Sequence, residues 1–312
     1  LQLFSGQDTN HYHREKLAPI QSTFNNQIKL GLGHRRFSIL DTSHDGHQPW
    51  VDSQTGNVLV FNGEIYNYIE LKQELLARGV GPFTTNTDTE VFGLAYQAWG
   101  ANCFNKFNGF WACAIYDKHN NNLILSRDRF GKKPLYIYEV DDSLYFSSEI
   151  KSIFAGLPDG NTRKTINNDA AFLYLAYDRR NTFYQSMWDN VDQIEQAIYH
   201  IYNMDTLACQ KVKYWKLPED RLSTKEITLE QATNKLRKLL QSAVAIRLRS
   251  DVPLEANLSG GMDSSAIVAH ATQLLKKKNI LELLKKTIFK KLFVMYSKPH
   301  QNVAKKISLN YY

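Results

Sequence analysis

The segment Ser259–Ser265 combines residue types that bind phosphate groups. It reads Ser-Gly-Gly-Met-Asp-Ser-Ser and lies between an apolar run at 252–258 and a helical pattern that follows it. Adjacent glycines, Gly260 and Gly261, let the backbone approach an anion without Cβ clashes, and the N–H groups of a helix start attract negative charge. The chain has no Gly-x-x-x-x-Gly-Lys-Ser/Thr pattern, so this segment is not a Walker A loop. Asp263 fits either of two roles, a Mg²⁺ ligand or a cap of the helix.

Other motifs accompany this loop in a fixed order. Along the chain they are Leu32–Asp41, Gly46–Pro49, Asn62–Asn67, Thr87–Glu90, Arg127–Gly131 with Pro134–Tyr136, Tyr214-Trp215 and Ser250–Leu254. Together with the loop they resemble the glutamine-hydrolysing asparagine synthetase family, in which a class II glutamine amidotransferase domain precedes an ATP-pyrophosphatase domain. The resemblance covers residues from about 30 to 271, and so many motifs in one order do not arise by chance.

The resemblance implies an amide-forming ligase. In that family ATP adenylates aspartate, and ammonia released from glutamine then displaces AMP. The resemblance therefore implies glutamine, ATP and aspartate as substrates, implies ATP and Mg²⁺ as cofactors, and admits a homodimer. The implied ATP-binding residues are Ser259, Gly260, Gly261, Asp263, Ser264 and Ser265, with Asp263 as the metal ligand.

Glutamine needs separate partners for its carboxylate, its ammonium and its side-chain amide. By resemblance, Arg36 binds the carboxylate with its bidentate fork, and Glu64 and Asp88 hold the ammonium. The Asn62 side chain and the Gly63 N–H would form the oxyanion hole. Taken singly, these residues also suit a surface ion pair, a hairpin turn or the first turn of a helix. The family pattern favours the pocket.

The chain departs from the family pattern at both ends. Class II amidotransferases attack glutamine with an amino-terminal cysteine, whereas this chain begins with Leu1, and residues 1–27 match nothing in the family. Ser5 lacks the terminal amine that would activate it, and Cys103 lies at the end of an expected helix. Residues 272–312 form a lysine-rich tail that the family does not have. We therefore expect a chain that is truncated or altered at both ends and inactive as it stands.

Two alternative functions stay open. One is a synthetase relative that does not use glutamine, as in the β-lactam synthetases and lasso-peptide cyclases, which keep a cysteine-free front domain as a scaffold. The other is a non-enzymatic module that binds glutamine or nucleotide. The glutamine-pocket residues favour the ligase over the scaffold, because a scaffold has no use for such a pocket. The sequence does not separate an inactive enzyme from a sensor.

Alternating and short apolar runs predict a succession of strands between residues 30 and 155. The expected strands are 58–61, a hairpin of 111–116 with 123–126, and a second hairpin of 135–140 with 143–147. Helices are predicted at 69–78 and 89–99, each ended by a glycine. Thr87 and Glu90 fit a capping box at the start of the second helix.

A polar segment at 216–227 contains Pro218 and marks a domain boundary. Residues 1–215 are expected to form an α+β domain, with two antiparallel sheets packed as an amidotransferase-type sandwich and helices on the outside. Residues 228–312 begin with a long amphipathic helix, followed by a strand at 252–258. We expect them to form an incomplete α/β ATP-pyrophosphatase domain.

The net charge of +7 belongs to the tail. Residues 272–312 carry ten lysines and one acid, so the rest of the chain is close to neutral and nucleic-acid binding is not expected. The three cysteines form neither a metal-binding pattern nor a disulfide framework. No stretch approaches the roughly 20 apolar residues of a membrane helix. We therefore expect a cytoplasmic protein without membrane contact.

Overall fold

The computed structural model of the 312-residue chain describes residues 28–157, 159, 162–179 and 184–277. It also places four short strands, β1 (Phe4–Ser5), β2 (Ala18–Pro19), β13 (Phe293–Tyr296) and β14 (Lys305–Ser308). Most of the expected basic tail, and most of residues 1–27, lie outside the described residues. In the described part, no helix is long and apolar enough to cross a membrane.

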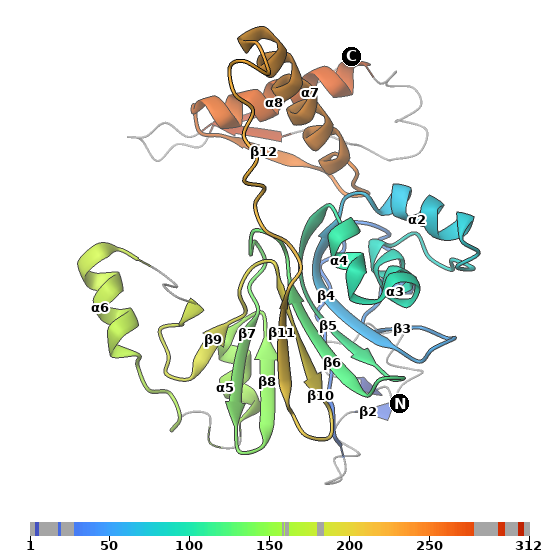
Figure 1. Ribbon diagram of the computed structural model, residues 1–312, viewed down its shortest axis with the longest axis vertical. Coiled ribbons are helices and arrows are strands. Elements are labelled where there is room, and N and C mark those ends of the chain that lie inside the picture. Colours follow the sequence, from blue (N-terminus) through green and yellow to red (C-terminus); the bar gives the residue numbers. More distant parts are fainter. Residues whose placement is uncertain are drawn as a thin grey trace.

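The front part is built around a six-stranded antiparallel sheet (Figure 1). In spatial order its strands are β11 (Cys209–Lys213), β10 (Ile198–Asn203), β6 (Asn122–Arg127), β5 (Gly109–Asp117), β4 (Val58–Ile65) and β3 (Trp50–Val51). The β4–β5 pairing runs from Val58 opposite Tyr116 to Ile65 opposite Gly109. The first half of β4 is buried, as its apolar run predicts.

A second antiparallel sheet consists of β8 (Ser143–Ser147), β7 (Tyr136–Val140) and β9 (Val191–Gln193). Apolar side chains from both sheets, such as Val60, Leu125 and Ile137, pack into one buried cluster between them. The helices α2 (Tyr68–Ala77), α3 (Asp88–Trp99) and α4 (Cys103–Lys106) contribute to the core on the other face of the large sheet, and α5 (Ile150–Gly156) to the core on the outer face of the small one. The front part is therefore layered as helix, sheet, sheet, helix.

The structure confirms the two predicted hairpins, because β5 pairs with β6 and β7 with β8. Asp141 and Asp142 form the turn of the second hairpin with φ values of 47° and 55°, a conformation that aspartate tolerates well. The sheets extend beyond the predicted interval, because β9, β10 and β11 come from residues 191–213. The helix α6 (Asn168–Tyr177) and two 3₁₀ turns, η2 (His44–Gly46) and η3 (Gly100–Asn102), complete the front part.

The predicted capping box at the start of α3 is only half present. The side chain of Thr87 accepts a hydrogen bond from the N–H of Glu90 at 3.2 Å, as predicted. The Glu90 carboxylate, however, accepts from the N–H groups of Thr84 and Thr85 at 2.8 and 2.7 Å. The prediction was wrong for Glu90, because the preceding loop offers two N–H groups to the same carboxylate.

The rear part contains α7 (Leu229–Arg247), β12 (Glu255–Leu258) and α8 (Met262–Lys277). The predicted strand at 252–258 is shorter than expected, and β12 pairs in parallel with β13. α7 starts with a complete capping box of Thr228 and Gln231. Its sequence is amphipathic, as predicted, but Leu229 and Leu236 are 85% and 66% exposed to solvent in the described structure. The pattern thus predicted the helix but not its packing.

Candidate functional site

Glu64 and Asp88 form a pair of buried carboxyl groups. Glu64 lies near the end of β4 and Asp88 is the first residue of α3, and they are 8% and 7% exposed. Asp88 Oδ2 accepts a hydrogen bond from the N–H of Ile65 at 2.9 Å. This contact fixes the start of α3 against the end of β4, and it brings together two acids that are far apart in the sequence.

Both acids have a raised pKa. Burial raises the pKa of Glu64 to about 7, with a further contribution from the charge of Asp88 and opposition from Lys133 and Arg247. Burial also raises the pKa of Asp88 to about 6, against three backbone N–H groups and the charge of Arg36. Two acids that are costly to ionise side by side are suited to a cationic ligand, which would compensate both charges.

The guanidinium of Arg36 organises the loop that contains it. Nη1 donates to the carbonyl oxygen of Ser43 at 2.8 Å, and Nη2 donates to those of Leu40 and Asp41 at 2.8 and 2.5 Å. Gly46 leaves room for this arrangement, because a Cβ atom there would lie 2.1 Å from Nη2. Either bidentate fork of an arginine needs an Nη2 proton, and both are used here. The Nε–H and one Nη1 proton remain for a ligand.

Asn62 and Gly63 precede Glu64 on β4. Because side chains alternate along a strand, Asn62 and Glu64 share the face of β4 that carries Val60, toward the second sheet. Asn62 Nδ2 donates to Ser148 Oγ, just after β8, at 3.0 Å. The structure thus places Asn62, Gly63, Glu64 and Asp88 around the end of β4, with Arg36 within electrostatic range of Asp88.

The segment between α7 and β12 attaches the rear part to this site. Arg249 donates to both carboxylate oxygens of Glu70, at 2.7 and 2.5 Å. Asp251 accepts from the N–H of Asp41 at 2.8 Å, and thereby reaches the loop that Arg36 organises. Asp251 belongs to the motif Ser250–Leu254, but its sequence position indicates no role, because its partner is known only from the folded structure.

The predicted phosphate loop lies at the turn between β12 and α8. Gly260 has a φ of 84°, which favours glycine. Ser259 Oγ lies 3.0 Å from Ser264 Oγ and accepts from the N–H of Gly261 at 3.4 Å. Ser259, Gly260, Gly261, Asp263 and Ser265 are exposed, while Ser264 is half-buried. The loop therefore presents hydroxyls and a helix start to solvent.

Asp263 lies exposed in the first turn of α8. Within the described residues, no three or more His, Cys, Asp and Glu side chains gather as metal ligands. A lone carboxylate beside a phosphate loop fits a Mg²⁺ ion held mainly by ligand phosphates and water, which is how this ion is often bound. The role of Asp263 as a metal ligand stays a prediction.

The cysteines lie in two other places, the core on the helix side of the large sheet for Cys103 and Cys113 and the edge strand β11 for Cys209. Cys103 and Cys113 are buried, and burial raises the pKa of both thiols. Cys209 is exposed on β11, with three strands between it and β4. At about 4.8 Å for each of the four strand spacings, that separation is roughly 19 Å. None of the three thiols is therefore placed to attack a ligand held by Glu64 and Asp88.

Lys133 and Arg247, the two cations that act on the pKa of Glu64, were not among the predicted site residues. Lys133 follows the motif Arg127–Gly131, and Arg247 is the last residue of α7. The adjacent lysines Lys132 and Lys133 after that motif could have indicated a cationic part of the site. Nothing in the sequence indicated that the end of α7 would come to the same place.

Comparisons with known proteins agree with the two parts of the chain. A family model described as a glutamine amidotransferase domain matches residues 16–215, and one described as asparagine synthase matches residues 235–289. The matches therefore begin within residues 1–27 and extend into residues 272–312, two segments that were expected to have no counterpart in the family. The putative glutamine-hydrolyzing asparagine synthetase 2 of Methanocaldococcus jannaschii is 40% identical over 254 residues, covering 77% of this chain and 47% of that protein. The glutamine-hydrolyzing asparagine synthetase 1 of Bacillus subtilis is 34% identical over 245 residues, covering 78% of this chain and 37% of that protein.

Among solved structures, the glutamine phosphoribosylpyrophosphate amidotransferase from B. subtilis is similar with a TM-score of 0.40 and 18% identity. That similarity covers 77% of this chain and 49% of the other. The chain thus spans less than half the length of the two curated relatives.

Proposed function

Since the chain belongs to the class II glutamine amidotransferase family and carries part of an asparagine synthase domain, we propose that it is part of an ATP-dependent, amide-forming ligase whose front domain binds glutamine. The observation that carries this proposal is the buried acid pair of Glu64 and Asp88 beside Asn62-Gly63 on β4. A pair of buried carboxyl groups with raised pKa values is a costly arrangement for structure alone, and it suits an ammonium ligand.

In this proposal the acid pair holds the α-ammonium of glutamine. The side-chain amide of glutamine lies against Asn62 and Gly63, whose donors would stabilise charge on its carbonyl oxygen. Arg36 meets the carboxylate through either its Nε–H or its remaining Nη1 proton, because its Nη2 protons are used by the loop. The structure therefore favours a single-sided contact from Arg36 over the bidentate fork expected from the sequence.

In the rear part, the loop Ser259–Ser265 would bind the phosphates of ATP, with Mg²⁺ at Asp263. Its hydroxyls and the start of α8 supply donors, and Gly260 supplies the turn. ATP would activate a carboxylate, which we propose to be aspartate, for attack by ammonia. The segment Arg249–Asp251 precedes β12 and contacts the front part of the chain. It therefore connects the proposed ATP-binding loop to the proposed glutamine site.

The proposal is tested by titrating the whole chain with L-glutamine in a calorimeter, with D-glutamine as the control. We expect saturable binding of L-glutamine at concentrations up to about 1 mM, the upper end of common KM values. D-glutamine should bind at least tenfold more weakly. With the configuration at the α-carbon inverted, its ammonium cannot reach the acid pair while its carboxylate reaches Arg36. A titration without saturation, or equal binding of both enantiomers, would contradict a glutamine site.

Glutamine binding should strengthen as the pH rises from 6 to 8. Glu64 has a pKa of about 7, so at pH 6 it is mostly protonated and must lose a proton before it can pair with the ammonium. We expect roughly a tenfold lower dissociation constant at pH 8, with protons released on binding at pH 6. In the variant Glu64→Gln, the glutamine dissociation constant should depend much less on pH. A dissociation constant that does not change over this range would show that Glu64 does not face the ligand.

The chain should release no ammonia from glutamine. Hydrolysis by this family needs a thiolate that forms an acyl-enzyme, and the thiols of Cys103, Cys113 and Cys209 are buried or roughly 19 Å from β4. Oxyanion donors alone leave only residual catalysis. The measurement is ammonia formation at saturating glutamine, compared with a heat-inactivated sample. Ammonia above that control would mean that another nucleophile serves the site.

A further inference from the structure

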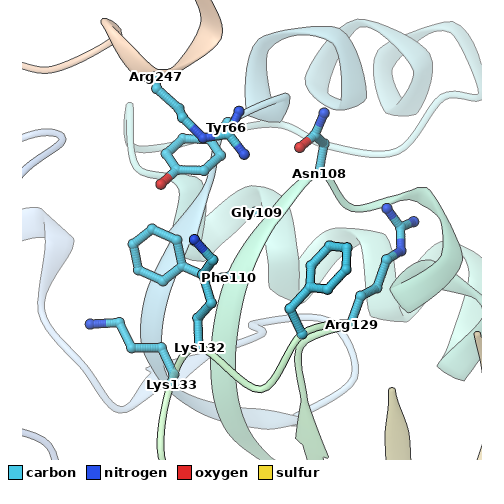
Figure 2. A pocket seen from close by; sticks show the side chains of 9 residues that line it. Tyr66, Asn108, Gly109, Phe110, Arg129, Lys132, Lys133 and Arg247 are labelled. Carbon is cyan, nitrogen blue, oxygen red and sulfur yellow. The ribbon is translucent and has the colours of Figure 1, made fainter. Parts of the chain in front are cut away.

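A cavity lies at the start of β5, where the end of α7 meets the front part (Figure 2). Its volume is about 300 Å³. The residues that line it are Tyr66, Asn108, Gly109, Phe110, Arg129, Phe130, Lys132, Lys133 and Arg247. Three of them are aromatic and four are cationic, while none is acidic. This composition is typical of a site for an anion.

The loop that carries three of the cations is fixed from both sides. The buried carboxylate of Asp128 accepts hydrogen bonds from the N–H groups of Phe130, Lys132 and Lys133, at 3.0 to 3.1 Å. The Arg127 side chain donates hydrogen bonds to carbonyl groups of the same loop, including one from Nε to the carbonyl oxygen of Lys133 at 2.6 Å. The cationic side chains therefore project from a backbone that is organised before any ligand arrives, which lowers the cost of binding.

The four cations have no acidic partner in ion-pair contact within the described residues. Arg129 Nη2 donates to the carbonyl oxygen of Asn105 at 2.7 Å, while its Nε is buried and makes no hydrogen bond to the described residues. Lys133 Nζ lies 5.0 Å from the centre of the Phe110 ring, and the Arg247 guanidinium lies 4.5 Å from that of Tyr66. Carbonyl groups and rings thus position these charges, and Glu64, which interacts electrostatically with Lys133 and Arg247, makes no ion-pair contact with them in the described structure.

The cations come from both parts of the chain. Arg129, Lys132 and Lys133 follow β6, whereas Arg247 is the last residue of α7. Figure 2 shows Arg247 over the ring of Tyr66, and Lys132 extending toward Tyr66 and Phe110 from the opposite side. An anion between Lys132 and Arg247 would contact the front and the rear part at once.

We propose that this cavity binds a small phosphate-bearing anion, which joins the end of α7 to the loop after β6. Four cations exceed what one carboxylate requires, and a volume of about 300 Å³ is at the lower end of ligand pockets, enough for a diphosphate or a nucleoside monophosphate. The rings of Phe110 and Phe130 offer faces on which a base could stack. This cavity shares no residue with the proposed glutamine site or with the loop Ser259–Ser265, and the proposal does not depend on either assignment.

Calorimetric titration of the whole chain with pyrophosphate, inorganic phosphate and AMP, at low ionic strength, tests the proposal. We expect pyrophosphate to bind more tightly than phosphate, and AMP to exceed phosphate only if its base stacks on a ring. Lys132→Gln and Arg247→Gln should each weaken pyrophosphate binding about tenfold, as expected for loss of one charged hydrogen bond. Both side chains are exposed, so unfolding temperatures should show that the variants remain folded.

Two control variants distinguish binding in this cavity from general charge attraction and from binding at the loop Ser259–Ser265. Lys225→Gln removes one exposed lysine of the linker and should leave binding unchanged. Ser264→Ala alters the other phosphate loop and should leave the response to Lys132→Gln intact. The proposal is overturned if the chain binds no pyrophosphate at concentrations up to about 5 mM, above the usual range of small-ligand KM values. It is overturned equally if Lys225→Gln weakens pyrophosphate binding as much as Lys132→Gln. It is also overturned if Ser264→Ala weakens pyrophosphate binding and Lys132→Gln does not.

Discussion

Replacing Asp88 with Asn should weaken glutamine binding about 100-fold. Asp88 is buried and would face the α-ammonium, and removing one charge from a buried, hydrogen-bonded pair costs roughly 2–5 kcal/mol. The asparagine oxygen can still accept from the N–H of Ile65, so the start of α3 should keep its place. The measurement is the glutamine dissociation constant, with the unfolding temperature as a check on the fold.

A matched control for this variant is Asp142→Asn. Asp142 is exposed in the turn between β7 and β8, where its φ of 55° is one that asparagine also adopts. This variant removes one negative charge from the same domain and should leave the dissociation constant within about twofold. If Asp88→Asn and Asp142→Asn bind glutamine equally well, then Asp88 is a structural residue and the acid pair does not hold the ligand.

The largest effect on stability is expected from Gly63→Ala. A Cβ atom at Gly63 would lie 2.1 Å from the carbonyl oxygen of Phe110 and 2.8 Å from the Cα of Trp111. Both atoms belong to the backbone of β5, so the clash can be relieved only by moving strands apart in the centre of the large sheet. We expect a loss of about 3 kcal/mol in the free energy of unfolding, at the upper end for overpacking. Urea denaturation followed by circular dichroism measures it.

Gly33→Ala is the control for that variant. No atom lies within 4 Å of a Cβ built at Gly33, and its backbone does not adopt a positive φ. This change should therefore alter the free energy of unfolding by less than about 0.5 kcal/mol. Equal stability of Gly63→Ala and Gly33→Ala would mean that β4 and β5 are not as close as the structure places them.

The sequence predicted those parts of the fold that depend on local patterns. The hairpins at 111–126 and 135–147 could be predicted because apolar runs, polar turns and strand length agree over a few residues. β9, β10 and β11 were not predicted, because β9 has only three residues and β11 is mostly exposed. The half-formed capping box shows the same limit, since Glu90 accepts from N–H groups of a loop rather than from its own helix start.

The candidate site was predictable only through resemblance to a family. Composition and spacing alone left Asp88 as a favourable charge in a helix turn, and its contact with Ile65 is seen only in the folded chain. The bidentate role of Arg36 is less favoured, because three carbonyl groups of its own loop compete for its protons. No sequence pattern indicated that Arg247 would line a cavity of the front part. Helix α7 reaches the front part through tertiary contacts, which local patterns do not encode.

The most direct test of the central claim compares two ligands on two proteins. L-Glutamine and glutaramate differ in the α-ammonium, which is the group that Glu64 and Asp88 are proposed to hold. The original chain should bind glutaramate about 100-fold more weakly than L-glutamine, and Asp88→Asn should bind the two almost equally. Equal binding of both ligands by the original chain, or an undiminished preference for L-glutamine in Asp88→Asn, would contradict the assignment of this acid pair to glutamine.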